Sequence, residues 1–236
     1  MTRTNTAPPK SPKWRRRPEH RPQQIIEAAL EVFGECGLAK TRLQDIADRA
    51  GVSKGTIYLY FPNKEELFRE MVRQTAVAAI ESGEKTTAHG TPTEQLCAAM
   101  REYWKFVRSP VFSTIYRLVL GELHQFPDLA KFYADEVVAR MQKMLSGIIQ
   151  RGVEAGEFRE IDPAVAARML MALTVMNAIW RDEHTGVPLL CHKNDEEVFR
   201  ELAHFYLHSL TTSVGASAQA DGAPLDFAPF IPFNND

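Results

Sequence analysis

The residues with the clearest chemistry lie at the start of a short predicted helix, Ser53 to Phe61. Lys54, Thr56 and Tyr58 bring a cation, a hydroxyl and a phenol to its first turns. Such groups suit contacts with phosphates and base edges in the major groove of DNA. Lys64 follows at the start of the next predicted helix, where a lysine opposes the helix dipole unless an anion such as a DNA phosphate completes the site. Each residue alone is compatible with an ordinary surface helix, but their arrangement favours DNA binding.

A preceding helix and a tight turn must position these groups. Thr41 is the predicted N-cap of that helix, because its hydroxyl can accept a bond from a first-turn amide. Gly51 ends it, since glycine adopts a left-handed backbone conformation readily, and Ser53 caps the second helix. The first helix has an apolar stripe with helical spacing, formed by Leu43, Ile46, Ala47 and Ala50. Two short helices around such a turn are typical of a helix-turn-helix.

The motif IIEAALEVFGECGLAKTRLQDIADRAGVSKGTIYLYFPNKEELF resembles the signature of the TetR/AcrR family of bacterial transcriptional repressors. The resemblance runs from about Arg21 to Val72, about a fifth of the chain. With the two caps included, the DNA-binding residues it implies are Thr41, Arg42, Gln44, Ser53, Lys54, Gly55, Thr56, Tyr58, Tyr60 and Lys64. Arg42 stands where many relatives have threonine or serine, so we expect it to contact a base or a different phosphate.

The charge of the chain is divided unevenly between its two parts. Residues 1–64 hold 12 Lys and Arg against 6 Asp and Glu, whereas the remainder holds 16 against 24. A basic head on an acidic body favours nucleic-acid binding at one end only. Within residues 1–20, the run Lys13 to Arg17 could follow a phosphate backbone or enter a minor groove, or it could be a solubilising tail.

We predict an all-α fold, with a three-helix DNA-binding domain joined to a larger helical domain for ligand binding and dimerisation. The predicted divisions are a disordered basic arm at 1–20, the helix-turn-helix domain at 21–82 (the motif itself at about 42–61), the C-terminal domain at 83–214 and a tail at 215–236. The tail is rich in Ala, Pro, Asp and Phe, and it could dock on the body or stay loose. The other predicted helices are Pro22 to Gly37, Asn63 to about Ser82, Pro92 to Arg108, one from Pro110, Pro127 to Gly152 or Gly156, one from Asp162 and Pro163, and Asp195 to about Val214, with a loop at Gly83 to Thr91.

Aromatic and methionine side chains of the C-terminal domain could line an adaptable apolar pocket, although plain core packing explains any one of them. The predicted pocket residues are Met100, Tyr103, Trp104, Phe106, Tyr116, Leu120, His124, Met144, Met176 and Trp180. Stripes on the last two helices suit packing across an interface, which the family resemblance assigns to a dimer. The predicted interface residues are Val165, Met169, Ala172, Met176, Ile179, Phe199, Leu202, Tyr206 and Leu210. The alternative is that both stripes face only their own core.

An enzyme is the second class considered, but no catalytic triad, phosphate-binding loop or metal-spaced cluster stands out. His204 and His208 are four residues apart on one helix, without a convincing third metal ligand nearby. Cys36, Cys97 and Cys191 are widely spaced, which favours reduced thiols over a disulfide framework, with redox sensing as the alternative. We therefore expect no catalysis, cofactor or metal.

No uninterrupted apolar stretch approaches the roughly twenty residues of a membrane span, and the basic N-terminus does not resemble a signal peptide. The expected location is the bacterial cytoplasm, on the nucleoid when DNA is bound. The leading hypothesis is a homodimeric repressor on a near-palindromic operator, released by a small hydrophobic or amphipathic effector. The alternative is a DNA-binding activator or regulator without an inducer. The operator, the regulated genes and the effector do not follow from the sequence.

Overall fold

The computed structural model describes residues 21–180 and 193–211, and the elements named within these ranges are helices. They are α1 (Arg21–Cys36), α2 (Leu43–Ala50), α3 (Lys54–Tyr60), α4 (Lys64–Val72), a π-helical segment (Arg73–Val77), α5 (Ala78–Thr86), α6 (Pro92–Val107), α7 (Pro110–Gly121), a 3-10 turn (Leu123–Gln125), α8 (Pro127–Tyr133), a second π-helical segment (Ala134–Ala139), α9 (Arg140–Glu154), α10 (Pro163–Trp180) and α11 (Asp195–Leu210). The prediction of an all-α fold, with an N-terminal helix-turn-helix and a larger helical body, is confirmed.

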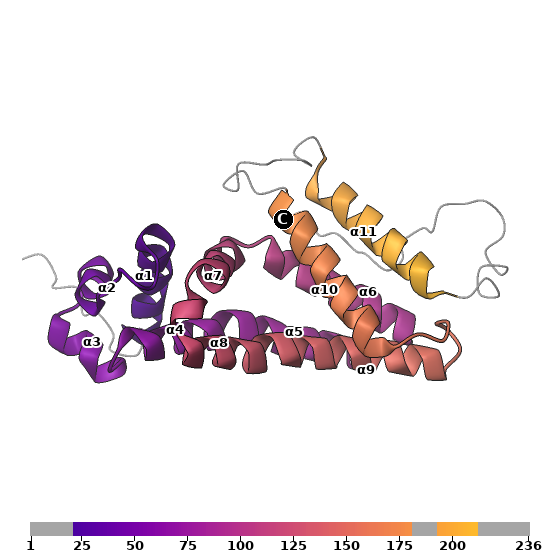
Figure 1. Ribbon diagram of the computed structural model, residues 1–236, viewed down its shortest axis with the longest axis horizontal. Coiled ribbons are helices and arrows are strands. Elements are labelled where there is room, and N and C mark those ends of the chain that lie inside the picture. Colours follow the sequence, from indigo (N-terminus) through magenta and orange to yellow (C-terminus); the bar gives the residue numbers. More distant parts are fainter. Residues whose placement is uncertain (1–20, 181–192, 212–236) are drawn as a thin grey trace, which may run out of the picture.

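Helices α1, α2 and α3 form the head of the molecule (Figure 1). Its core contains Phe33 of α1, Ile46 of α2 and Ile57 of α3, each at most 1% exposed. Phe33 also meets Phe68 of α4 edge to face, with ring centroids 6.3 Å apart. The head is therefore joined to the long helix that follows it by shared apolar packing.

Gly37 and Gly51 end α1 and α2 with left-handed backbone angles, φ 79° and 64°. The sequence-based prediction for Thr41 is wrong, because Arg42 occupies the N-cap position of α2. The Asp45 carboxylate accepts a 3.0 Å bond from the N–H of Arg42. The hydroxyl of Thr41 instead donates to the carbonyl of Gly37 at 2.6 Å, and the residue is 2% exposed. Thr41 closes the turn between α1 and α2 and is not available as a DNA contact.

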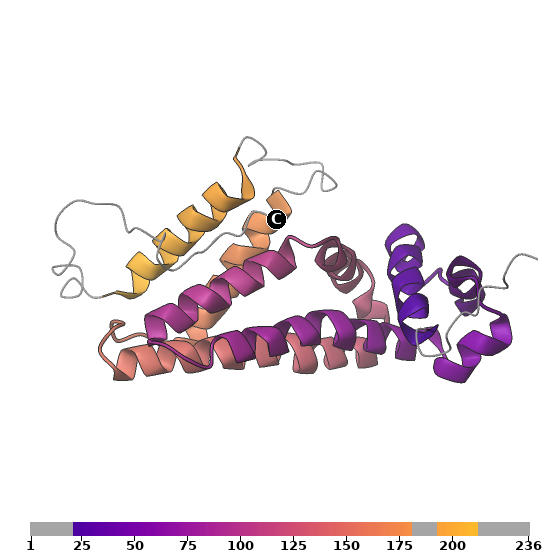
Figure 2. The same ribbon diagram turned by 180° about the vertical axis from the view of Figure 1, so that it is seen from behind.

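The body is built on two long helical rods that lie side by side in Figures 1 and 2. One runs from Lys64 to Thr86 through α4 and α5, and the other from Pro127 to Glu154 through α8 and α9. The predicted loop at Gly83 to Thr91 begins too early, because the helix continues to Thr86. Gly83 is buried within α5 beside Met144, although glycine costs roughly 1 kcal/mol within a helix.

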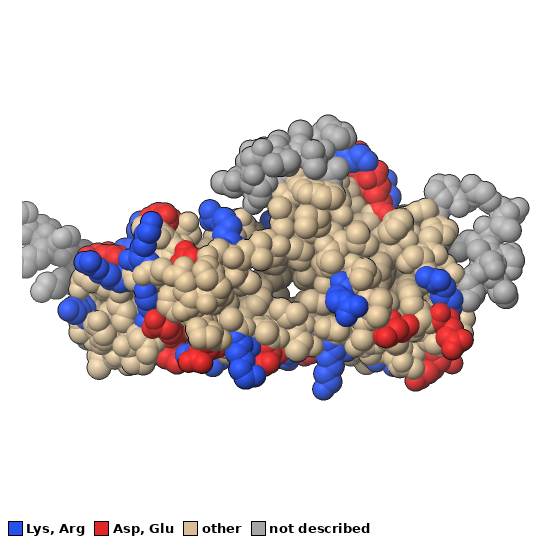
Figure 3. Space-filling view, in the orientation of Figure 1, with Lys and Arg blue, Asp and Glu red and all other residues tan. Residues whose placement is uncertain are grey.

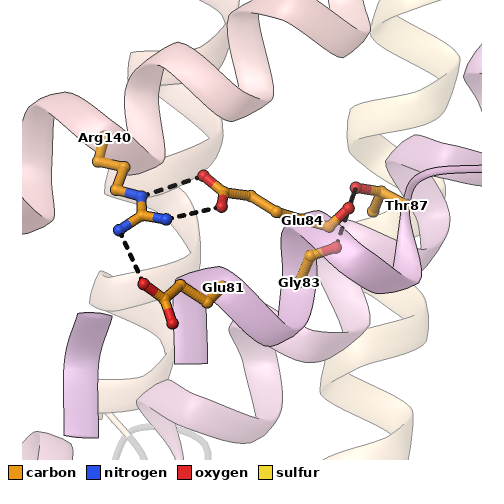
Figure 4. Close-up of polar contacts among 5 residues, drawn as sticks. All are labelled: Glu81, Gly83, Glu84, Thr87 and Arg140. Carbon is orange, nitrogen blue, oxygen red and sulfur yellow. Dashed lines mark hydrogen bonds and ion pairs between the residues drawn. The ribbon is translucent and has the colours of Figure 1, made fainter. Parts of the chain in front are cut away.

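An ion-pair cluster ties the two rods together. The guanidinium of Arg140 donates to both carboxylate oxygens of Glu84, at 3.1 and 2.8 Å, and to Glu81 at 3.3 Å (Figure 4). These contacts lower the pKa of Glu84, chiefly through the hydrogen bond from Arg140. One residue beyond the end of α5, Thr87 donates its hydroxyl to the carbonyl of Gly83 at 2.9 Å. The cluster fixes the register of α5 against α9.

Figures 1 and 2 show α7 between the head and the rest of the body, with α10 and α11 on the side away from α3. Helix α10 packs on α9, with further contacts to α6 and α11. By length and composition, with a mean hydropathy of 1.3, α10 is the one helix in residues 21–180 and 193–211 that is apolar enough to cross a membrane. Its packing accounts for it as a helix of the bundle, with one side left exposed.

Candidate functional site

The face of α3 that points away from the head carries the residues with the clearest binding chemistry. Ser53 caps the helix by accepting the N–H of Thr56 at 3.1 Å. Ile57 anchors the helix in the core, whereas Tyr58 and Tyr60 are 49% and 39% exposed. Lys54 and Gly55 are also exposed. The helix therefore presents a cation and a phenol on one side, from Lys54 and Tyr58, and a second phenol, from Tyr60, further around its exposed surface, and such groups suit DNA binding.

Helix α2 adds fewer free groups to this surface. Arg42 is exposed, and its guanidinium has no hydrogen bond or ion pair within the described ranges. Gln44 is half-buried and donates to Asp48 at 2.7 Å. Arg49 is paired with Glu31 and Glu35 at 2.8 and 2.7 Å, which neutralises it. Among these side chains, Arg42 is the best placed to bind an anion.

Lys64 has a different role from the one the sequence suggests. Its ammonium donates to the carbonyls of Leu38, Ala39 and Thr41 at 2.7, 2.8 and 3.2 Å. An ammonium has three protons, so all three are used in closing the turn between α1 and α2. The prediction that the Lys64 side chain holds a DNA phosphate is therefore corrected, because the protein's own carbonyls take the place of that phosphate.

The same turn is also held from the body. Glu122, directly after α7, accepts the N–H of Ala39 at 2.6 Å. A Cβ on Gly37 would lie 2.0 Å from a Glu122 carboxylate oxygen and would displace that carboxylate, and the φ of 79° also favours glycine there. Lys64 Nζ lies 5.8 Å from the ring centre of Phe126, which immediately precedes α8. Sequence reasoning missed Glu122 and Phe126, since nothing local pairs them with a turn more than eighty residues earlier.

The charge pattern of the folded head is weaker than that of residues 1–64 as a whole. Figure 3 shows Lys and Arg around α1 to α3, mixed with acidic residues. Residues 1–20 carry six of the twelve basic residues in 1–64 and only one of the six acidic ones. Most of the positive charge predicted for the head therefore belongs to residues 1–20, which lie outside the described ranges.

The predicted pocket residues divide into two groups. Met100, Tyr103 and Trp104 are buried, and Phe106, Tyr116 and Met144 are half-buried. The predictions for Leu120, His124, Met176 and Trp180 are wrong, because all four are exposed, Leu120 by 65%. Their helical spacing was compatible with an inward face, but the direction of that face depends on neighbouring helices.

A small, partly open cavity lies among α5, α6 and α9, with a volume of ≈ 10 Å³, about one water molecule. Its lining includes Tyr103, Phe106 and Met144 together with Ala79, Ile80, Gly83, Ala99, Glu102 and Met141. Figure 3 also shows the surface hollowed near its middle, with α7 and α10 on either side in Figure 1. The cavity is too small for a drug-sized molecule without movement of its walls.

Three tyrosines gather in this part of the body. Burial raises the pKa of Tyr103, and Tyr133 and Tyr116 raise it further, which indicates that the phenols lie close together. Burial also raises the pKa of Tyr133, to about 12, and that of Tyr116. Among the described residues, none of the three hydroxyls has a hydrogen-bond partner. They are neutral donors at physiological pH, and within the described residues they have no acceptor of their own.

The predicted dimer residues behave differently on the two helices. On α10, Val165, Met169, Ala172 and Met176 are exposed and Ile179 is half-buried. On α11, the predictions for Phe199, Leu202, Tyr206 and Leu210 are wrong, because each is at most 7% exposed in its own core. The phenol of Tyr206, for example, donates to the carbonyl of Ala166 at 2.5 Å. Phe205, which the sequence did not single out, is 64% exposed instead.

The cysteines and the histidine pair carry no clear chemistry. Burial raises the pKa of Cys97 to about 11, which makes its thiol unreactive, and Cys36 is exposed. Cys191 lies outside the described residues. The rings of His204 and His208 are 4.2 Å apart, but no group of three or more potential metal ligands exists within residues 21–180 and 193–211.

Two family profiles match the chain, that of bacterial regulatory proteins of the tetR family over residues 25–71 and that of the AefR-like transcriptional repressor C-terminal domain over residues 94–208. The fatty acid metabolism regulator protein of Bacillus subtilis is 30% identical over 157 residues, which is 66% of this chain and 79% of that protein. The matched regions thus include both the head and most of the body.

Solved structures share the fold. The complex of SmeT, the repressor of a Stenotrophomonas maltophilia multidrug efflux pump, with triclosan has a TM-score of 0.67 at 20% identity, covering 81% of this chain and 92% of that one. A transcriptional regulator from Saccharomonospora viridis in complex with choline has a TM-score of 0.66 at 21% identity, covering 82% and 99%. At these identities the likeness concerns the fold alone.

Proposed function

The chain belongs to the TetR family of bacterial regulatory proteins, and from this we propose that it is a homodimeric, effector-responsive repressor. Members of the family are DNA-binding transcriptional regulators and not enzymes. In the proposal, the two α3 helices of a dimer enter successive major grooves of a near-palindromic operator, about one turn of DNA apart. The dimer acts in the cytoplasm, on the nucleoid when DNA is bound.

The exposed surface of α3 carries the proposal. Lys54 and Tyr58 supply groups for phosphates and base edges, with Tyr60 at the end of the helix. Arg42 adds a free guanidinium from α2, while Ser53 and Thr56 share a 2.8 Å contact between their hydroxyls. Gln44 would have to leave Asp48 to reach a base. The arm at residues 1–20 supplies most of the positive charge that attracts the phosphate backbone.

For the dimer, the proposed interface is the exposed side of α10 with Phe205 of α11. Met169 and Met176 are 49% and 41% exposed, and Trp180 at the end of α10 is 40% exposed. Exposed apolar side chains of this kind lose contact with water when a second copy of the chain covers them. Figure 3 shows few charged residues over α10, which favours burial between two copies.

The effector is proposed to be a small hydrophobic or amphipathic molecule with a hydrogen-bond acceptor. Tyr103, Tyr116 and Tyr133 offer neutral phenol donors for that acceptor, beside apolar walls that include Met144. The cavity must widen to admit the molecule. Similar proteins include a fatty acid metabolism regulator and two regulators whose structures contain triclosan or choline. A small organic effector for this chain is compatible with these similarities.

Helix α7 provides a physical route from effector to DNA. Tyr116 belongs to α7, and Glu122 immediately after α7 bonds the head at Ala39. An effector that shifts α7 would move the head and change the spacing of the two α3 helices. A coupling of about 1 to 3 kcal/mol between effector and DNA would give a useful response. A regulator or activator without an inducer is the alternative, and it would lack this coupling.

The test is DNA binding by the full-length protein to its own upstream region at two salt concentrations. Tyr58→Ala and Lys54→Ala should weaken the discrete complex, whereas Tyr58→Phe should keep the ring contacts. Lys131→Ala, a lysine on α8 paired with Asp135, is the charge-matched control and should bind as wild type does. Equal binding by all variants would exclude α3 as the recognition helix.

A further inference from the structure

The side of α3 opposite its buried face, formed by Gly55 and Leu59, carries no polar side chain. With about 100° of rotation per residue, Leu59 lies roughly 160° around the helix from Ile57. Ile57 is fully buried and Leu59 is 84% exposed, the highest exposed fraction among the large hydrophobic residues described. Gly55 lies one turn before Leu59 on the same side. The part of α3 that would reach deepest into a groove is thus a glycine followed by a leucine.

The glycine at position 55 has no role within the protein. Its φ is not positive, so the backbone does not require glycine there. A Cβ at this position would meet only the hydroxyl of Ser53, at 3.9 Å, so packing does not require glycine either. Within a helix, glycine is destabilising relative to alanine. A destabilising residue that serves neither packing nor conformation points to the close approach of a partner.

The chemistry of Leu59 restricts what it can recognise in DNA. Its side chain has neither donor nor acceptor, so it cannot read the polar edges of guanine, cytosine or adenine. The apolar group exposed in the major groove is the C5 methyl of thymine. Tyr58 and Tyr60 flank Leu59 with phenols that can bind phosphates on either side. An isolated exposed leucine would need no explanation on an ordinary surface, but this one is central to the proposed DNA face.

We propose that Leu59 recognises a thymine methyl group in each operator half-site, and that Gly55 provides the clearance for this contact. Leu59 is then a specificity-determining residue, whereas the charged groups around it supply affinity. This inference rests on the proposed function, because it requires α3 to enter the major groove.

The experiment uses a duplex selected from a random-sequence pool by the full-length wild-type protein. Each thymine of a half-site is replaced in turn by deoxyuridine, which lacks only the methyl group. At one thymine, wild type should lose about fourfold in affinity per half-site. Leu59→Ala should bind the thymine duplex more weakly and show no further loss with uracil. Leu59→Ala should retain the wild-type helical content, since Leu59 is a surface residue.

The second part of the experiment uses Gly55→Ala, which tests the clearance at this position. Its melting temperature should equal or exceed that of wild type, while its affinity for the selected duplex should fall about tenfold. The inference is overturned if deoxyuridine lowers the affinity of wild type and of Leu59→Ala by the same factor at every position. It is also overturned if Gly55→Ala binds the selected duplex with wild-type affinity. In both cases the proposed function stands. If wild type selects no sequence from the pool, both are overturned.

Discussion

The Glu122 carboxylate accepts a 2.6 Å hydrogen bond from the backbone N–H of Ala39. This bond joins the end of α7 to the turn between α1 and α2, more than eighty residues apart in sequence. From the other side, the ammonium of Lys64 donates to the carbonyl of the same residue at 2.8 Å. The turn that orients the helix-turn-helix is thus held by one anion from the body and one cation from α4.

Replacing Glu122 with Gln should uncouple the head from the body. The charge-assisted bond to Ala39 is lost or weakened, at a cost of about 1 kcal/mol in the free energy of unfolding. We expect weaker DNA binding and a smaller response to effector, because the head is less firmly oriented. Fluorescence anisotropy with labelled operator, with and without effector, measures DNA binding and its response to effector. Thermal unfolding measures the loss of stability. Glu136→Gln, an exposed carboxylate on the second rod, is the control.

Lys64→Met tests whether this lysine is structural. Three carbonyls lose their donor, so the free energy of unfolding should fall by about 1 to 3 kcal/mol. The slope of log affinity against log salt should stay at the wild-type value, since no phosphate contact is removed. A slope reduced by about one unit would instead show that Lys64 contacts phosphate and would restore the original prediction.

The buried tyrosines predict a loss of stability at alkaline pH. The folded-state pKa of Tyr133, about 12, exceeds the unfolded value of about 10, so this stabilising contribution is complete below pH 10. As the pH rises from 10 towards 12, the unfolded state ionises first and stability falls by up to about 1.4 kcal/mol per pH unit for this group. Tyr133→Phe should unfold with a shallower pH dependence. Urea unfolding between pH 8 and 11.5 measures the difference, and an unchanged slope would contradict it.

Met169→Glu should separate the proposed dimer without unfolding the protomer. The side chain is 49% exposed, so a carboxylate remains hydrated in the monomer but would be desolvated in the interface. Sedimentation velocity should show a monomer, and operator binding should be lost with it. Val138→Glu introduces the same charge at a residue that is 40% exposed on the second π-helical segment, and it should leave the dimer intact.

The prediction of helices succeeded where the signal is local. Asn63 caps α4 by accepting the N–H of Glu66 at 2.7 Å, and Pro92 and Pro110 begin α6 and α7 as predicted. Capping side chains and proline act on backbone groups within a few residues, so neighbouring sequence suffices to place them. Gly83 misled the prediction because glycine lowers helix stability without forbidding a helix, and α5 is held by its packing on α6 and α9.

The sequence by itself determined the helix-turn-helix motif, the family and the residues that α3 presents, since all of these depend on neighbouring residues. Only the tertiary structure decided that Thr41 and Lys64 serve the turn rather than DNA, and that Phe199 and Tyr206 face inward while Met169 faces outward. Helical periodicity identifies an apolar face, but the direction of that face is set by whichever helix packs against it. Likewise, a lysine donates to the nearest acceptors, and for Lys64 these are carbonyls that only the folded chain brings within reach.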